Sequence, residues 1–437
     1  MNTLDVLKEH LSNLISPYGH HLGLTPEEAA YFYIGPAEEV APGVYIFYSL
    51  GNSTTFICDG GLMQVDCHTY QHAPGIIKAV RERTDLPFET ITITHGHVDH
   101  CGGIFHYAKD NERRSYPQPR VIGSSTLRKR MDRYKMMEGS RRYTNTRQFR
   151  PVPSQTEKVS EPLDIMFVYP DTEFRDRLEI TVGKDVFQLV FSGGHTDDAI
   201  WVYCRSRKVL CCGDEFQWGA PNLGNPYKVQ RYAKESAEAL EEMAACGAEV
   251  LCPGHGPVIY GKDEIKTCLL TVAHYNYHIQ NHVVNCMNKG MFLEETINSL
   301  KMPDELLNSK WLRPLHGHPI FTARAIYHRY GGYYAGKPAG LIPPVYADIS
   351  REVLSLANGT EAVITRAKEL QAAGKIELAC QVAEWAVEGD PQCKQGWELY
   401  GLLFKERAEN EVNLQARGCW NTAVCNAVDA LESLNDE

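Results

Sequence analysis

The chain has 437 residues, enough for two or three domains, and its 43% hydrophobic and 23% charged residues are typical of a globular protein. Its net charge of −11 argues against nucleic acid as a general partner. There is no apolar run long enough to span a bilayer and no signal-peptide pattern, and the 14 cysteines follow no regular framework. We therefore expect a cytoplasmic protein with reduced thiols and no membrane partner.

In chain order, residues 1–37 predict an N-terminal helical arm, and residues 38–265 predict the first large domain. In that domain, short β-rich runs alternate with helical segments, as in two sheets with helices on their outer faces. The earliest predicted elements are strands at 43–48, 53–59 and 62–66 and a helix at 74–83.

The most informative segment follows a β-branched run at 90–94, which predicts a buried strand. Directly after it, His95, His97, Asp99 and His100 fall within six residues, and the Cys-Gly-Gly at 101–103 permits a sharp turn into a helix. Imidazole and carboxylate are ligands of Zn²⁺ and similar divalent ions. The pattern therefore predicts a metal centre on a loop at the end of a strand.

The next segment, residues 106–150, is strongly basic, with 13 Lys and Arg against 4 Asp and Glu. It could steer an anionic substrate toward the metal centre, or it could form a solvated helix face or a surface for a protein partner. The sequence leaves these alternatives open.

Three further ligand candidates follow in order, and each ends a strand-like run. His195 follows the alternating run 186–190, Asp214 follows 209–211, and His255 follows 250–252. With the first motif they resemble the HxHxDH signature and downstream ligands of the metallo-β-lactamase superfamily.

This resemblance implies an α/β fold, the αββα sandwich, with two Zn²⁺ per chain, for which Mn²⁺ or Fe²⁺ could substitute. It also implies how the ligands divide between the two ions. One ion is assigned His95, His97 and His195, the other Asp99, His100 and His255, and Asp214 bridges the two. Asp66, which ends a predicted strand, matches the family position whose carboxylate supports the metal loops.

Several residues outside the ligand set are candidates for the substrate pocket. Glu215 follows Asp214 directly, and the aromatic and polar loop 218–227 comes soon after, although this loop could also be a plain connector. His316 and His318 could approach the site or could be structural histidines. The candidates for substrate binding are Glu215, Trp218, Asn222, Asn225, Tyr227, Arg231, His316 and His318.

The last third of the chain is predicted to be helical, with a helical extension and connecting segment at 266–345 and an all-α domain at 346–437. The run at 332–341 resembles a segment of alkyl-sulfatase-type enzymes that precedes their dimerisation domain. The resemblance implies a homodimer formed through the region after about residue 322. Such sulfatases tend to have glutamates where this chain has His195 and Asp214, a pair found instead in glyoxalase-II-like and lactonase-like hydrolases.

Together these features predict a metal-dependent hydrolase in which a hydroxide held between two ions attacks the substrate and Asp99 accepts a proton. The expected substrate is a small, anionic organic molecule with a carboxylic ester, thioester or lactone bond. One alternative is an alkyl sulfatase that cleaves sulfate esters. Another, from a different class, is a non-catalytic interaction protein that is merely stabilised by metal.

Overall fold

A computed structural model describes residues 2–14, 30–149, 153 and 167–436 of the chain. Residues 15–29 of the predicted arm and Arg150 of the basic segment lie outside the described residues. The contacts divide the chain into two compact units. The sandwich unit contains Leu24–Met137 and Leu163–Gly332, and the helical unit contains Met1–Gly23, Glu138–Pro162 and Tyr333–Glu437.

The first sheet of the sandwich unit has seven strands in sequence order. Strands β1 to β4 form an antiparallel meander, whereas β4 to β7 run parallel and are joined by helical crossovers. The strands are β1 (Glu38–Ala41), β2 (Val44–Phe47), β3 (Ser53–Cys58), β4 (Gly61–Val65), β5 (Phe88–Thr92), β6 (Arg120–Ser124) and β7 (Thr172–Phe174).

The second sheet has six strands in the order β13-β12-β11-β10-β9-β8. Only β11 and β12 pair in parallel, so the chain leaves both strands at the same edge of the sheet. The strands are β8 (Arg177–Val182), β9 (Asp185–Phe191), β10 (Ile200–Cys204), β11 (Val209–Gly213), β12 (Val250–Pro253) and β13 (Ile259–Tyr260).

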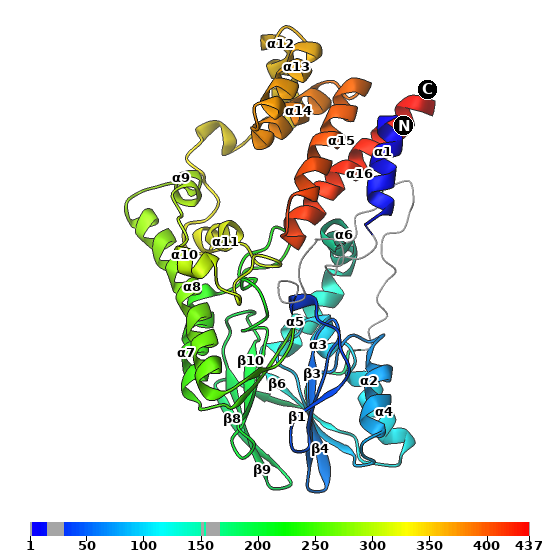
Figure 1. Cartoon of the computed structure of the whole chain (residues 1–437), viewed down its shortest axis with the longest axis vertical. Coiled ribbons are helices and arrows are strands. Elements are labelled where there is room, and N and C mark those ends of the chain that lie inside the picture. Colours follow the sequence, from blue (N-terminus) through cyan, green and yellow to red (C-terminus); the bar gives the residue numbers. More distant parts are fainter. Residues whose placement is uncertain (1, 15–29, 150–152, 154–166, 437) are drawn as a thin grey trace. The chain divides into compact units, whose positions relative to one another are not determined.

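The two sheets pack face to face over an apolar core in which the Phe56 and Phe187 rings meet edge to face at 5.0 Å. Helices α2 and α4 cover the first sheet, and α7 and α8 cover the second (Figure 1). The helices of this unit are η1 (Ala30–Phe32), α2 (Ala73–Arg81), α3 (Val98–Cys101), α4 (Ile104–Arg113), α5 (Leu127–Met136), α7 (Ala233–Ala245), α8 (Lys262–Asn288), α9 (Leu293–Asn298), α10 (Asp304–Leu307) and α11 (Pro319–Gly331).

The helical unit has its own core, built from α12 to α16. Helix α1 packs on α15 and α16 and buries Leu7 completely, and α6 lies so close to α16 that a Cβ on Gly418 would be 1.9 Å from the Gln148 carbonyl. The helices are α1 (Thr3–Ser12), α6 (Glu138–Phe149), η3 (Pro338–Gly340), α12 (Tyr346–Leu356), α13 (Thr360–Ala372), α14 (Ile376–Gly389), α15 (Lys394–Glu409) and α16 (Leu414–Asp436).

This architecture confirms the predicted fold class, a sandwich of two sheets with outer helices followed by a helical region. The individual expectations hold to within two residues for the strands at 43–48, 53–59 and 62–66 and for the helix at 74–83. The described part of the chain contains no helix that is both long and apolar enough to cross a membrane.

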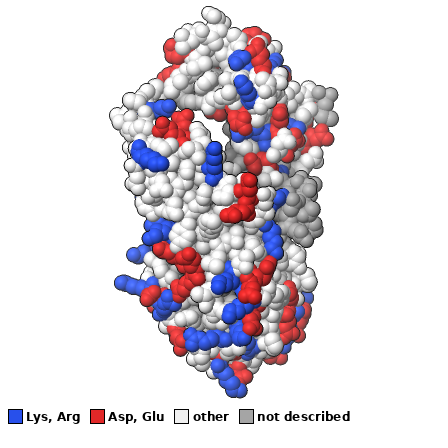
Figure 2. All heavy atoms as spheres, turned by 60° about the vertical axis from the view of Figure 1, so that its left-hand side comes forward, with Lys and Arg blue, Asp and Glu red and all other residues white. Residues whose placement is uncertain are grey.

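Four of the twelve described basic side chains of the segment 106–150 pair with acidic residues outside it. Arg128 pairs with Glu173, Arg114 with Asp85, and Arg130 and Arg133 both contact Asp197. On the face shown in Figure 2, positive and negative side chains are interspersed. The net positive charge counted from the sequence of this segment is therefore larger than the charge that remains after these ion pairs form.

Candidate metal centre

Four strand ends meet at one edge of the sandwich and place all the predicted ligands there. The loop after β5 carries His95 and His97, the β9–β10 loop carries His195, and the ends of β11 and β12 carry Asp214 and His255. Backbone contacts join the loops, because Ile200 N donates to Thr94 O at 2.8 Å. Gly213 has a φ of +53° and lies against Thr94, where a Cβ would be only 2.8 Å from that side chain.

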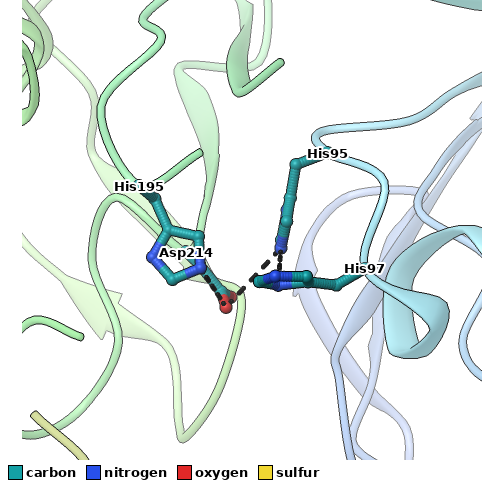
Figure 3. Close-up of side chains that lie close together, drawn as sticks. All are labelled: His95, His97, His195 and Asp214. Carbon is teal, nitrogen blue, oxygen red and sulfur yellow. Dashed lines mark hydrogen bonds and ion pairs between the residues drawn. The ribbon is translucent and has the colours of Figure 1, made fainter. Parts of the chain in front are cut away.

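The first ligand group is His95, His97, His195 and Asp214, whose side chains converge in Figure 3. His95 Nε2 lies 2.8 Å from His97 Nδ1, and Asp214 Oδ2 lies 3.7 Å from His95 Nε2 and 3.3 Å from His195 Nε2. Burial lowers the pKa of all three histidines well below the usual value. They are therefore neutral near pH 7, which is the form that binds metal.

The second group is Asp99, His100 and His255. Asp99 Oδ2 lies 3.5 Å from His255 Nε2 and 3.8 Å from His100 Nε2. The other oxygen of Asp214, Oδ1, lies 3.3 Å from His100 Nε2 and 3.4 Å from His255 Nε2. The two oxygens of this carboxylate thus face different groups, which is the geometry that a bridging ligand requires.

The chemistry of these residues fits a divalent metal. Nitrogen and carboxylate oxygen atoms lie within 4.8 Å of one another in each group. The buried atoms His100 Nε2 and Asp214 Oδ1 lie 3.3 Å apart, and neither has a well-formed hydrogen bond among the described residues, which is costly unless a ligand binds them. Burial raises the pKa of Asp214, but His255, His100 and His195 outweigh it and hold the pKa well below the usual range.

Asp66 lies behind the first motif and fixes its geometry. Its Oδ1 accepts a hydrogen bond from Thr94 N at 2.7 Å, and its Oδ2 accepts from Thr94 Oγ1 at 2.7 Å and lies 2.8 Å from His100 Nδ1. The carboxylate therefore turns the opposite nitrogen of His100, Nε2, toward Asp214. Asp66 has a φ of +59°, a conformation that a non-glycine residue adopts only where its surroundings enforce it.

Glu215 does not face the ligand cluster. Its Oε1 accepts hydrogen bonds from Ser192 Oγ, Gly194 N and His195 N at 2.7, 3.2 and 2.9 Å. The side chain is 1% exposed, and burial raises its pKa. In this structure it stabilises the loop that presents His195.

Two supporting residues, Asp198 and Arg130, were missed by the sequence analysis. Asp198 Oδ2 accepts from Gly96 N at 2.6 Å, and its Oδ1 accepts from Thr196 Oγ1 at 2.6 Å, so it joins the loops of His97 and His195. Arg130 projects from α5, and its Nη2 lies 3.1 Å from His97 Nε2. The Thr-Asp-Asp run after His195 was the available signal for Asp198, whereas nothing in the sequence separated Arg130 from its basic neighbours.

Arg231 is the predicted pocket residue that lies nearest to the ligands. Its Nη1 lies 2.6 Å from His195 Nε2 and 3.1 Å from His195 Nδ1. Burial lowers its pKa to about 10, with a further contribution from nearby Arg130, so the guanidinium stays charged at neutral pH. Within the described residues no carboxylate forms an ion pair with it.

The loop 218–227 packs against the segment 311–317, with Gly219 N donating to Trp311 O and Ala220 N to Arg313 O. The Trp218 indole donates to the Pro257 carbonyl at 2.7 Å, beside the His255 loop. The other candidates on this loop are placed differently, since Asn222 is buried, Asn225 accepts from Tyr227 N, and Tyr227 is 38% exposed.

His316 and His318 have different environments. His316 is buried and lies against the ring of Tyr31, with a centroid distance of 5.0 Å. Burial, with His255 and Arg231 nearby, lowers the pKa of His316 to about 3. His318 instead caps α11, because its Nδ1 accepts from Ile320 N at 3.2 Å.

A two-sheet sandwich with this ligand cluster at its edge defines a metal-dependent hydrolase. Residues 52–255 match the family model of the metallo-beta-lactamase superfamily, and residues 293–427 match that of alkyl sulfatase dimerisation. Neither match spans half of the chain, and together they identify a metallo-beta-lactamase-like domain followed by an alkyl sulfatase dimerisation region.

The known proteins that this chain resembles in sequence or structure include several alkylsulfatases. A linear primary-alkylsulfatase from a Pseudomonas species is 23% identical over 82% of this chain and 70% of its own length. An (R)-specific secondary-alkylsulfatase from Pseudomonas is 24% identical, and the match covers 88% of this chain but only 61% of that relative. The solved structure of a stereoselective inverting sec-alkylsulfatase from Pseudomonas superposes with a TM-score of 0.80 at 22% identity. The match covers 92% of this chain and 67% of the other chain, which supports the fold.

Proposed function

We propose that this chain hydrolyses sulfate esters of small organic alcohols, with two divalent ions, most simply Zn²⁺, held by the two ligand groups. This was the alternative in the sequence analysis, and the names of the relatives support it over a carboxylic ester, thioester or lactone. The proposal also includes a cytoplasmic location, which is supported by fourteen cysteines that are all free.

The observation that carries the proposal is the environment of Arg231. A buried guanidinium without a carboxylate partner is strongly unfavourable unless an anion binds it. A sulfate monoester keeps a negative charge on the group that is cleaved, whereas a neutral ester or lactone offers none. A sulfate head beside His195 would therefore complete this site.

In this proposal, each residue near the two ligand groups has a separate role. Divalent ions held by the two ligand groups would supply Lewis acidity and would lower the pKa of bound water from 15.7 to about 7. Arg231 binds the anionic head, whereas Arg130, which is paired with Asp197 and Asp198, lies against His97. Asp99, whose side chain is 20% exposed, lies at the accessible edge of the cluster and accepts the proton from water. His316, uncharged in its buried position, can donate a hydrogen bond to the substrate.

A carboxylic ester, thioester or lactone remains the second candidate. The observation in its favour is the ligand set, because His195 and Asp214 stand where the resembling sulfatases tend to have glutamates. Lys and Arg in the basic segment do not decide between the candidates, since five of their twelve described side chains pair with acidic residues.

The test is product release from a panel of primary and secondary alkyl sulfates, thioesters and lactones by the metal-loaded protein. We expect inorganic sulfate to be released and expect Arg231→Gln to lower kcat/KM for sulfates about 100-fold, because it removes a charged hydrogen bond. Arg128→Gln is the matched control, since that guanidinium pairs with Glu173. Turnover of thioesters or lactones without any sulfate release would refute the proposal in favour of the second candidate.

A further inference from the structure

The five histidines of the centre are not held in the same way. His95 has Thr94 Oγ1 at 3.1 Å from its Nδ1, and His100 has Asp66 at 2.8 Å. His195 and His97 instead lie against the side chains of Arg231 and Arg130, whose guanidinium nitrogens are 3.1 Å from His195 Nδ1 and His97 Nε2 and can only donate. Among the described residues, none forms a hydrogen bond with His255 Nδ1. A metal-binding histidine usually has such a partner, which fixes the orientation of its ring.

The backbone around His255 is fixed, but this does not orient the ring. Asn52 donates from Nδ2 to the carbonyls of Pro253 and Gly256 at 3.0 and 2.8 Å, and its N–H donates to Gly254 O at 2.7 Å. These bonds set the course of the loop through residue 255. They leave the side-chain torsions of His255 to be determined by what touches its ring.

The ring of Tyr31 covers one face of His255. The two rings are stacked, with centroids 4.7 Å apart and an angle of 17° between their planes. Tyr31 is 9% exposed and comes from η1, which precedes the first sheet and lies outside both matched family regions. The adjoining backbone fits closely as well: Gly256 has a φ of +88°, and a Cβ there would lie 2.8 Å from Ala30 O.

We propose that Tyr31 is a positioning residue for His255, which it holds by ring stacking rather than by a hydrogen bond. The stacked ring keeps His255 Nε2 directed toward Asp99 Oδ2 and Asp214 Oδ1, at 3.5 and 3.4 Å. Loss of the stack frees the imidazole to rotate away from the second ligand group. The inference rests on the proposed binding of two ions but not on the identity of the substrate.

The experiment is a titration of the full-length apoprotein with Zn²⁺ in competition with a coloured chelator, which resolves the two binding steps. Tyr31→Ala should weaken one step about tenfold and leave the other unchanged, which is the size expected for a lost aromatic contact. Tyr31→Phe keeps the ring and should bind as the wild type does. Tyr33→Ala is the matched control, since Tyr33 is two residues away, is 39% exposed, and packs on Tyr48.

Tyr31→Leu separates positioning from simple filling of space, and thermal denaturation of each variant monitors folding. Leucine keeps apolar volume but cannot stack, so we expect it to weaken the same Zn²⁺ step as alanine does. Wild-type affinity in Tyr31→Leu or Tyr31→Ala would overturn the proposal, and so would a wild type that binds one ion. Because the measured quantity is Zn²⁺ affinity, this experiment can be interpreted even if the protein releases no sulfate from the substrates tested.

Discussion

The two ligand groups of the centre share Asp214 but differ in what surrounds them. The first group is bordered by two buried guanidinium groups, from Arg130 and Arg231. The second contains the partly exposed Asp99 and is covered by the aromatic ring of Tyr31. The Arg231 guanidinium beside the first group favours an anionic head, whereas the partly exposed carboxylate of Asp99 in the second group favours proton transfer. We therefore expect the first group to bind the anionic head of the substrate and the second group to take part in proton transfer.

The largest effect is expected from Asp99→Asn, which keeps the shape of the side chain but removes its charge and basicity. The variant loses both a ligand of the second group and the proton acceptor, and each role is worth on the order of 100-fold. We expect turnover to fall by several orders of magnitude, measured as product release at saturating substrate. Glu112→Gln, which removes an exposed carboxylate paired with Lys109, is the control. Wild-type turnover in Asp99→Asn would exclude this carboxylate from the centre.

A smaller effect is expected from Asp66→Asn, which acts through another residue. The amide NH2 group only donates, so it cannot replace Oδ1, which accepts from Thr94 N, or Oδ2, which lies 2.8 Å from His100 Nδ1, and the support of His100 is weakened in either orientation. Such support is typically worth about 10- to 100-fold in metal affinity. Chelator competition should show this loss at the step that involves His100. Asp110→Asn, which breaks a buried pair with Arg81, should lower stability without changing metal affinity; equal losses of metal in both variants would contradict the assignment.

The sequence was sufficient to predict the fold class and to name seven residues that the structure places in two adjacent groups. Order and local pattern carried that information, because each ligand directly follows a strand and strand ends meet at one edge of the sandwich. Asp66 was predicted as a supporting residue from its match to a family position at a strand end, and Arg231 as a pocket residue because its loop follows Asp214. Both roles stay predictions, and the ligands themselves share a place directly after a strand.

The residues that the sequence could not reveal come from segments without a motif. Tyr31 is separated from His255 by more than two hundred positions, and its contact is a ring stack that has no sequence signature. Arg130 is one of three consecutive basic residues, and only the direction of the helix turns it toward His97. Glu215 was predicted beside the substrate, but its hydrogen bonds are to the His195 loop, because the residue after Asp214 turns away from the cluster.

The helical unit provides a contrast with the centre, because several of its large apolar side chains are exposed. Ile342, Val345 and Leu356 are 89%, 66% and 84% exposed, and the region matches the alkyl sulfatase dimerisation model. We expect a homodimer that buries these side chains and in which Ile342→Asp weakens association about 10- to 100-fold, as expected for loss of one buried aliphatic side chain. Light scattering over a dilution series measures this. Leu270→Asp, on α8 of the sandwich unit and outside the matched region, is the control at a side chain that is 39% exposed, and a wild type at 49.2 kDa would refute the dimer.

The smallest effect concerns stability in the sandwich unit, where two acidic residues of one region can be compared. Asp185 accepts hydrogen bonds from Ser206 and Arg207 at 2.6 Å, whereas Asp59 pairs with Lys184 in an exposed position. Burial raises the pKa of Asp185, but Arg207 and Ser206 outweigh it and lower the pKa below the usual value. We expect Asp185→Asn to cost about 1–3 kcal/mol at pH 7 and Asp59→Asn less than about 1 kcal/mol.

The pH dependence of this difference gives the check. A carboxylate whose pKa is lower in the folded protein stabilises the fold above its unfolded pKa of about 3.9, and loses that contribution as the pH falls through the folded pKa. The gap in unfolding free energy between wild type and Asp185→Asn should therefore be constant from pH 7 to about pH 5 and shrink below about pH 4. Urea denaturation at each pH measures it. A gap that stays the same down to pH 3 would show that the charge on Asp185 contributes nothing beyond its shape.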